Sequence, residues 1–317
     1  MLSDAQKTFF ETEGYLVVED VLDKRSVIDS VKDEYSKLMD TLYEGWYSEG
    51  KVLAPPEALD FHGKLLAAYK AGCDWFQPMD ISLPGDRITN ETPMHFGPAI
   101  FDLITHERLL DLVEDLIGPE LVSNPIQHVR IKPPETTLRQ DEIRAHITAT
   151  YWHQDRAVGH ADADETNMVT VWCAISDATI ENGCLQVIPK AHRQGMKPHC
   201  PKVQTAIADG FIDENTAVPL PVKSGGVVIF HPLAPHASLV NKTDSFRWSF
   251  DIRFNKIGEQ TGRAHFPEFI ARSKANPSSE MRDWRLWKHN WELARKRLAT
   301  SPHINIHRWQ SDAPFCA

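Results

Sequence analysis

The chain has 317 residues, and its 34 lysines and arginines against 44 aspartates and glutamates give a formal net charge of −10. This acidic balance argues against a nucleic-acid-binding protein, which needs a basic surface to neutralise phosphates. The sequence predicts neither a transmembrane helix nor a signal peptide, because it lacks long apolar runs and a basic start. Five scattered cysteines without a CxxC motif favour a reduced, cytoplasmic chain with structural thiols.

The first part of the chain, to about residue 120, is predicted to be mainly helical. A short helix that runs into a β-branched strand is expected over residues 9–18. Apolar residues recur at helical spacing over residues 24–43 and 100–117, which predicts two further helices. The stretch between them, residues 46–98, carries prolines and tryptophans, and we expect it to be irregular.

From about residue 121 the hydrophobic period changes to two, which is typical of β-strands. Residues 246–254 alternate between apolar and polar side chains, so one face of that strand packs on a core. The opposite face must meet solvent or a polar lumen. Several short strands with turns between them favour an antiparallel sandwich or barrel. The strand candidates are residues 126–132, 167–175, 184–188, 217–222, 226–231, 235–240 and 246–254.

A final amphipathic helix is predicted over residues 279–299, where Trp284, Trp287 and Trp291 share one face. We expect this face to pack on the strands, and a basic helix that docks on a partner or a membrane is the alternative. No repeat or linker divides the chain, which favours a single domain over residues 1–317. Its expected parts are a helical region (1–120), a β-barrel core (121–255) and a carboxy-terminal helical extension (256–317).

The strongest chemical motif is His153-Gln154-Asp155. Histidine is the commonest metal ligand, but the chain has 15 histidines and a lone HxD motif is weak on its own. On a strand, residues two apart point to the same face, so His153 and Asp155 can bind one ion together. With His236 they would form the 2-His-1-carboxylate triad of non-haem Fe(II) oxygenases.

Arg247 follows His236 on the next predicted strand and strengthens this reading. A guanidinium is suited to bidentate binding of a carboxylate. A ligand that chelates iron at one end and carries a carboxylate at the other would span the gap, and 2-oxoglutarate has this shape. Ser238 shares the face of His236 and is placed to add a hydroxyl. The alternative role for Arg247 is a surface salt bridge. The position of Arg247 on the polar face of the strand disfavours this alternative.

With these motifs the sequence resembles the phytanoyl-CoA dioxygenase family of Fe(II)/2-oxoglutarate oxygenases. FFETEGYLVVEDVLD resembles the family's opening helix–strand unit, QHVRIKPPE its first barrel strand, and YWHQD its HxD strand. VTVWCAISDATIENGCLQVIPKAHRQG resembles the mid-barrel hairpin, although it ends in Pro-Lys-Ala-His instead of the usual Pro-Gly-Ser-His. GGVVIFHPLAPHASLVNKTDSFRWSFDIRF resembles the strands of the distal histidine and the arginine. The likeness covers about residues 9–255.

The resemblance implies a mainly β fold with flanking helices. The expected architecture is a double-stranded β-helix, a cupin-like jelly-roll barrel with amino- and carboxy-terminal helices packed outside. It also implies that His153, Asp155 and His236 bind Fe(II). Arg247 and Ser238 would bind the distal carboxylate of 2-oxoglutarate, and O₂ would be the second co-substrate.

Three further positions match residues that often line the co-substrate or the iron in this family, namely Gln127, Trp172 and Gln154. Strand packing is the alternative for Gln127 and Trp172. Related halogenases replace the carboxylate ligand with a small residue, so Asp155 disfavours halogenation. Hydroxylation is the default reaction, and desaturation, epimerisation or ring formation would use the same residues.

Substrate contacts are expected from the irregular region 46–98, from the loops 133–150 and 156–166, and from the carboxy-terminal tail. The loop 156–166 is long and polar, as a mobile lid would be. No evident patch for the phosphates of coenzyme A is present, which favours a free small molecule or a natural-product scaffold. A cupin-like metalloenzyme without 2-oxoglutarate, or an inactive barrel that serves as a binding module, are the alternatives. For each candidate substrate contact, core packing or an exposed loop is the alternative. The candidates are Trp75, Phe76, His95, Phe96, Trp152 and Arg156.

Overall fold

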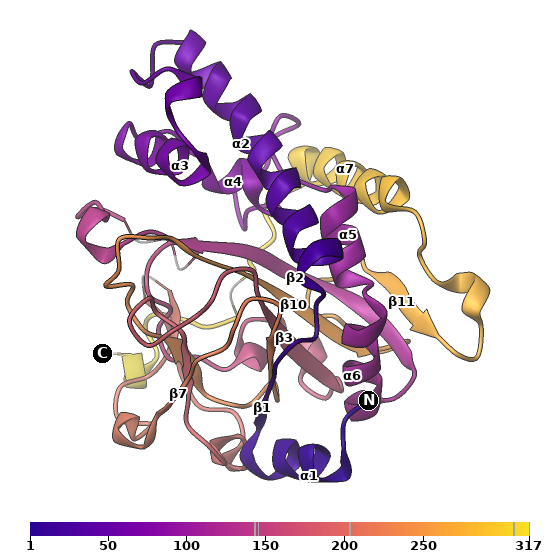
Figure 1. Cartoon of the computed structure of the whole chain (residues 1–317). Helices are drawn as coiled ribbons and strands as arrows, with labels where there is room; N and C mark the ends of the chain where they lie inside the picture. The colour runs from indigo at the N-terminus through magenta and orange to yellow at the C-terminus, as the bar shows by residue number, and fades with distance from the viewer. Residues whose placement is uncertain (143, 145, 203, 307, 317) are drawn as a thin grey trace.

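The computed structural model describes residues 1–142, 144, 146–202, 204–306 and 308–316. Two antiparallel sheets lie at its centre, and helices cover one side of the larger sheet (Figure 1). The fold is therefore mainly β with flanking helices, as expected for a jelly-roll architecture. In the described residues the sheets stay separate, so they do not form a closed barrel.

The larger sheet has six strands in the order β1-β8-β3-β10-β2-β11. They are β1 (Tyr15–Val18), β2 (Glu120–Lys132), β3 (Met168–Ala174), β8 (Val227–Phe230), β10 (Arg247–Lys256) and β11 (Phe269–Ser273). The second sheet has the order β7-β4-β9, with β4 (Leu185–Val187), β7 (Val218–Leu220) and β9 (His236–Ser238). A short ribbon pairs β5 (His199–Pro201) with β6 (Thr205–Ile207).

Strand β10 separates the hydrophobic core from a polar interior. Trp248 and Phe250 pack against Tyr35 of helix α2 (Asp29–Ser48), with their ring centroids 5.2 and 5.7 Å from that of Tyr35. Because successive residues of a strand point to opposite faces, the polar residues between them face the other way. The predicted alternation is confirmed, and the polar face of β10 looks into the interior between the sheets.

The amino-terminal part is mainly helical, as predicted, but it holds more helices than expected. The predicted irregular region 46–98 contains α3, which can form because no proline lies inside it, and the single turn α4, which includes Pro78. The helix expected over 100–117 is divided into α5 and α6. The helices are α1 (Asp4–Glu13), α2 (Asp29–Ser48), α3 (Phe61–Lys70), α4 (Phe76–Met79), α5 (Pro98–Ile104), α6 (Glu107–Ile117) and α7 (Trp284–Thr300).

The carboxy-terminal extension is helical only in part. Trp287 and Trp291 of α7 are buried, and Phe96 lies 4.6 and 5.1 Å from their rings, so the packing stripe is confirmed. Before α7 the chain adds β11 to the edge of the larger sheet beside β2, which the sequence reasoning missed. Residues 307 and 317 of the predicted extension lie outside the described residues. No described helix has the length and apolar character needed to span a membrane.

Cys200 on β5 and Cys316 near the carboxy terminus form a disulfide. The expectation that all five cysteines are reduced is therefore wrong for this pair. The two residues are separated by 116 positions, and only the fold brings them together. Disulfides are rare in the cytosol, so the cysteines no longer argue for a cytoplasmic chain, and that localisation stays a prediction.

Loss of this cross-link is expected to destabilise the protein. The variant Cys316→Ser removes a constraint on a long loop of the unfolded chain, and we expect unfolding free energy to fall by about 2–4 kcal/mol. Urea unfolding with and without dithiothreitol measures the effect. Reduction should weaken the native chain and leave Cys316→Ser unchanged. Cys73→Ser, at a buried free thiol, is the control, which should keep its sensitivity to reduction.

Candidate active site

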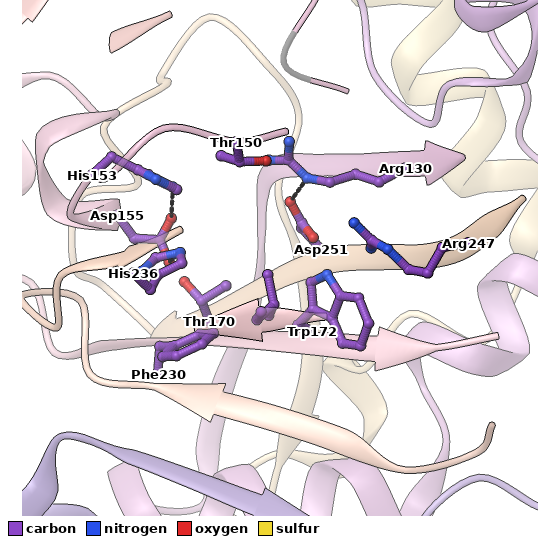
Figure 2. Close-up of a pocket in the computed structure, with 11 residues that line it drawn as sticks. Arg130, Thr150, His153, Asp155, Thr170, Trp172, Phe230, His236, Arg247 and Asp251 are labelled. Carbon is purple, nitrogen blue, oxygen red and sulfur yellow. Dashed lines mark hydrogen bonds and ion pairs between the residues drawn. The ribbon is translucent and has the colours of Figure 1, made fainter. Parts of the chain in front are cut away.

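Three side chains from two distant segments meet in the interior between the sheets (Figure 2). The ligand atoms of His153, Asp155 and His236 all lie within 4.8 Å of one another. Two backbone hydrogen bonds of 3.0 Å join His153 to His236 at the start of β9. This contact is a single β-bridge and not the strand expected for His153–Asp155, because Asp155 already begins a 3-10 turn.

The two histidines present their Nε2 atoms to this cluster. Nδ1 of His153 lies 2.9 Å from the backbone oxygen of Tyr151, and Nδ1 of His236 lies 3.0 Å from that of Ala234. Since a carbonyl oxygen only accepts, Nδ1 carries the proton in each neutral ring and Nε2 keeps a free lone pair. The buried Oδ2 of Asp155 has no hydrogen-bond partner among the described residues. This donor set fits divalent iron.

Arg253 of β10 supports the carboxylate. Its Nη2 forms an ion pair with Oδ1 of Asp155, and its Nη1 donates to the backbone oxygen of Ile126 at 3.0 Å. Burial alone raises the pKa of Asp155, but the guanidinium of Arg253 and the imidazoles of His236 and His153 outweigh it and hold this pKa well below its usual value. Asp155 is therefore ionised at neutral pH, with Oδ1 occupied and Oδ2 free.

A narrow pocket runs from the three-residue cluster to Arg247 (Figure 2). This side chain is fully buried, its Nη1 donates to Oγ of Ser249 at 2.8 Å, and its guanidinium lies 5.1 Å from the ring centroid of Trp172. Its Nε and Nη2 have no hydrogen-bond partner among the described residues. Buried donors without an acceptor mark a place for an anion such as a carboxylate. The lining residues are Arg130, Thr150, His153, Asp155, Thr170, Trp172, Leu185, Phe230, His236, Arg247 and Asp251.

An ion pair between Arg130 of β2 and Asp251 of β10 lines the pocket between the cluster and Arg247 (Figure 2). The sequence reasoning missed both residues. The signal was present, because His128, Arg130 and Lys132 alternate with apolar residues in β2. Antiparallel pairing then places them beside the polar face of β10.

Among the residues expected near the co-substrate, Trp172 lines the pocket and two glutamines do not. Nε2 of Gln127 donates to the backbone oxygen of Ile81 at 2.8 Å. The amide of Gln154 makes three hydrogen bonds of 2.7–3.0 Å to backbone atoms around it. Both amides hold separate segments together and neither is among the residues that line the pocket, so a role at the co-substrate stays a prediction.

Ser238 also lies outside the pocket lining. Its Oγ accepts a hydrogen bond of 2.8 Å from the backbone N–H of Thr150 and another from Nζ of Lys132. The first contact places the hydroxyl next to Thr150, which does line the pocket. Binding of the co-substrate carboxylate by Ser238 stays a prediction.

None of the six residues proposed as substrate contacts lines the pocket. Arg156 donates to the backbone oxygens of Ala163 and Thr166, both at 2.7 Å, and thereby shapes the loop that follows Asp155. Trp152 is partly buried and its backbone oxygen accepts from Ile207 at 2.8 Å. The guanidinium of Arg156 therefore holds the backbone of this loop in place. Its position next to the HxD motif could not show whether it does this or binds a substrate.

The other four candidates pack within the helical layer and at its border. His95 forms a hydrogen bond of 2.8 Å with Glu34, and Phe96 packs against Trp287 and Trp291 of α7. Trp75 is buried against Phe76, whose ring stacks on His146 at 4.8 Å. Aromatic residues of an unassigned loop serve packing as readily as binding, so the sequence did not separate the two roles.

A family model described as Phytanoyl-CoA dioxygenase (PhyH) matches residues 10–249. The chain belongs to the phytanoyl-CoA dioxygenase family. It is an Fe(II)- and 2-oxoglutarate-dependent dioxygenase with O₂ as its oxidant, as its motifs indicated. The family match ends at residue 249, so it does not include β11 or α7.

The curated relatives of this dioxygenase are distant in sequence. A phytanoyl-CoA dioxygenase domain-containing protein 1 homolog from Caenorhabditis elegans is 24% identical over 264 residues, which cover 77% of this chain and 87% of that protein. The peroxisomal phytanoyl-CoA dioxygenase of Homo sapiens is 29% identical over 174 residues. That match covers 53% of this chain and 49% of the human enzyme, so it relates only about half of each.

Solved structures of similar fold include the non-haem monooxygenase ThoJ in its apo form. It is 19% identical, with a TM-score of 0.59, and the match covers 93% of this chain and 96% of ThoJ. EvdO2 from Micromonospora carbonacea var. aurantiaca, complexed with 2-oxoglutarate, is 20% identical with a TM-score of 0.51. Its match covers 82% of this chain and 94% of EvdO2. At such identities the likeness shows the fold alone.

Mild acid is expected to destabilise the metal-free dioxygenase before its carboxylates titrate. Burial, as the largest cause, lowers the pKa of His199, His231 and His236 from 6.5 to about 4. The unfolded chain binds protons at these positions at higher pH than the folded chain does. Stability therefore falls as the pH drops from about 6.5 to about 4. Melting temperatures measured across this window test the prediction, and a constant value would contradict it.

Proposed function

We propose that this dioxygenase oxidises an unactivated C–H bond of a small organic molecule, with hydroxylation as the default outcome. The reaction would convert 2-oxoglutarate and O₂ to succinate and CO₂. One observation carries the proposal. Within the described part of the chain, the pocket joins a buried carboxylate oxygen of Asp155 that has no hydrogen-bond partner to the buried guanidinium of Arg247, which has no ion-pair partner. The two ends suit the metal and the far carboxylate of one co-substrate.

In this proposal His153, Asp155 and His236 hold the iron from one side. Bound there, iron supplies the open coordination positions for 2-oxoglutarate and O₂ and the oxidising power for C–H cleavage. Arg247 binds the distal carboxylate through Nε and Nη2, and its stacking on Trp172 fixes the plane of the guanidinium. Burial of the pocket excludes water, which strengthens these charged contacts.

A free small molecule or a natural-product scaffold is favoured over a coenzyme A thioester, because the chain carries no evident patch for the phosphates of coenzyme A. The fold relative SnoN is described as an epimerase from nogalamycin biosynthesis, 18% identical with a TM-score of 0.51. This supports a natural-product scaffold as the substrate class and keeps epimerisation as the second reaction type.

The test starts from protein loaded anaerobically with Fe(II). With 2-oxoglutarate and then O₂, we expect slow succinate formation that accelerates when a compound from a set of small natural products is a substrate. Labelling with ¹⁸O₂ separates the reaction types, because hydroxylation places label in the product and epimerisation does not. Binding of Fe(II) without any binding of 2-oxoglutarate would contradict the proposal and favour a different metalloenzyme.

A further inference from the structure

Lys132, the last residue of β2, is an unusual buried cation. It is 1% exposed and stands directly opposite Arg247 in the register of β2 and β10. Its Nζ bonds to Oγ of Ser238 and lies 3.4 Å from Oγ1 of Thr150. Among the described residues no carboxylate lies within 4.0 Å of either Lys132 or Arg247. An ammonium without a counterion is costly to bury.

Among the buried charges around the pocket, Lys132 and Arg247 are the two cations without an acidic partner among the described residues. The other buried basic residues on this polar face each have an acidic partner. These pairs are Arg130 with Asp251 and Arg253 with Asp155. Arg247 lines the end of the pocket far from the iron ligands, and Lys132 stands beside it in the register of the two strands, so two positive charges without an ion-pair partner among the described residues lie side by side. Such an arrangement is stabilised by an anion bound between or beside them.

The hydroxyl of Ser238 supplies the second part of the argument. A serine hydroxyl has two acceptor lone pairs and one proton to donate. The backbone N–H of Thr150 and Nζ of Lys132 occupy both lone pairs. The hydroxyl proton is thereby left to point away from these donors, and it has no acceptor among the described residues. Lys132 thus fixes Ser238 as a hydrogen-bond donor.

We infer that Lys132 is a positioning residue for the distal carboxylate of 2-oxoglutarate, acting beside Arg247 and through the hydroxyl of Ser238. This inference rests on the proposed function of the pocket and adds a determinant of co-substrate choice. Arg247 supplies the direct fork of donors, and Lys132 supplies the second charge and the orientation of Ser238. The pair would select a 2-oxo acid with a terminal carboxylate over one without it.

The titration of Lys132 gives the inference its own signature. Burial, followed by the charges of Arg247 and Arg130, lowers the pKa of Lys132 well below its usual value, and Asp251 opposes them. These are the charged groups that face the ammonium from β10 and from its own strand. A carboxylate bound nearby raises this pKa, so binding of 2-oxoglutarate should take up a fraction of a proton. Affinity should then fall as the pH rises.

The experiment compares two ligands and two variants. Full-length protein loaded with Mn²⁺, which does not turn over, is titrated by calorimetry with 2-oxoglutarate and with 2-oxopentanoate, which lacks the terminal carboxylate. In Lys132→Met the preference for 2-oxoglutarate should fall about ten- to hundredfold, as for loss of hydrogen bonding to a charged group. Lys64→Met on α3, where Lys64 is also buried but pairs with Asp40, should keep the native preference.

Proton uptake is measured on the unmodified protein, so the test does not depend on whether Lys132→Met folds. Titrations in buffers with different ionisation enthalpies should show uptake with 2-oxoglutarate and none with 2-oxopentanoate. Equal uptake with both ligands, or an unchanged preference in folded Lys132→Met, would overturn the role of Lys132 and leave the proposed function intact. Failure of the unmodified protein to bind 2-oxoglutarate would instead contradict the proposed function itself.

Discussion

The variant His153→Ala is expected to lose Fe(II) binding and succinate formation together while keeping its fold. His153 contributes one of three ligand atoms within 4.8 Å of one another, and two remaining protein ligands hold a divalent ion poorly. Disturbing only a residue around a metal ligand costs up to about 100-fold in affinity, so removal of a ligand should cost at least about that much. Anaerobic titration with Fe(II) and a succinate assay measure both quantities.

A matched control separates loss of the metal from loss of a buried ring. His231 is also a histidine whose pKa burial lowers to about 4, but it lies outside the cluster of ligand atoms. His231→Ala should therefore retain Fe(II) binding even if its melting temperature falls. A native Fe(II) affinity in His153→Ala would remove this residue from the proposed iron site.

The variant Arg253→Met is expected to destabilise the metal-free protein by about 3–5 kcal/mol, the usual cost of breaking one side of a buried ion pair. The guanidinium of Arg253 compensates Asp155 when no metal is present, since it pairs with Oδ1, and Oδ2 has no hydrogen-bond partner among the described residues. A divalent ion supplies positive charge to the same carboxylate. Mn²⁺ should therefore restore more stability to Arg253→Met than it adds to the native protein. Urea unfolding with and without Mn²⁺ measures both effects.

Arg263 offers a matched control for this prediction. It is also buried, but its guanidinium donates to the backbone oxygens of Gly262 and Val158 and has no acidic partner within 4.0 Å among the described residues. Arg263→Met should lose stability without any special recovery in Mn²⁺. If Mn²⁺ rescued both variants equally, the proposed link between Arg253 and the metal carboxylate would be wrong.

Part of the metal triad could be predicted from a compact local pattern, since His153 and Asp155 are two residues apart. His236 is distant in the chain, and it was predicted from the resemblance of its segment to the family's distal-histidine strand. Arg247 could also be predicted, since a charged residue inside an alternating strand must face a polar space. The supporting residues could not be assigned in this way. Nothing local distinguishes the amide of Gln154, which joins backbone loops, from one that binds a ligand.

Contacts between residues far apart in the chain could not be predicted either, because the local sequence does not show which segments the fold brings together. The pairing of Cys200 with Cys316 and of Arg253 with Asp155 depends on which segments the fold places together. Lys132 reads as an ordinary strand residue until β2 and β10 are placed in register and its charge is found without a partner. The short strand β11 was missed because it forms by pairing with the edge of β2, which lies far from it in the chain.

The sequence by itself determined the class of this protein, an acidic, mainly β dioxygenase with a His153, Asp155 and His236 motif. Those features depend on composition, period and short spacings, which are local properties of the chain. The tertiary structure alone decided which buried charges are compensated and which are left for a ligand. The physical reason is that burial and ion pairing depend on which residues the fold brings together. The same charged side chain is neutralised by a partner in one environment and is left to bind a ligand in another.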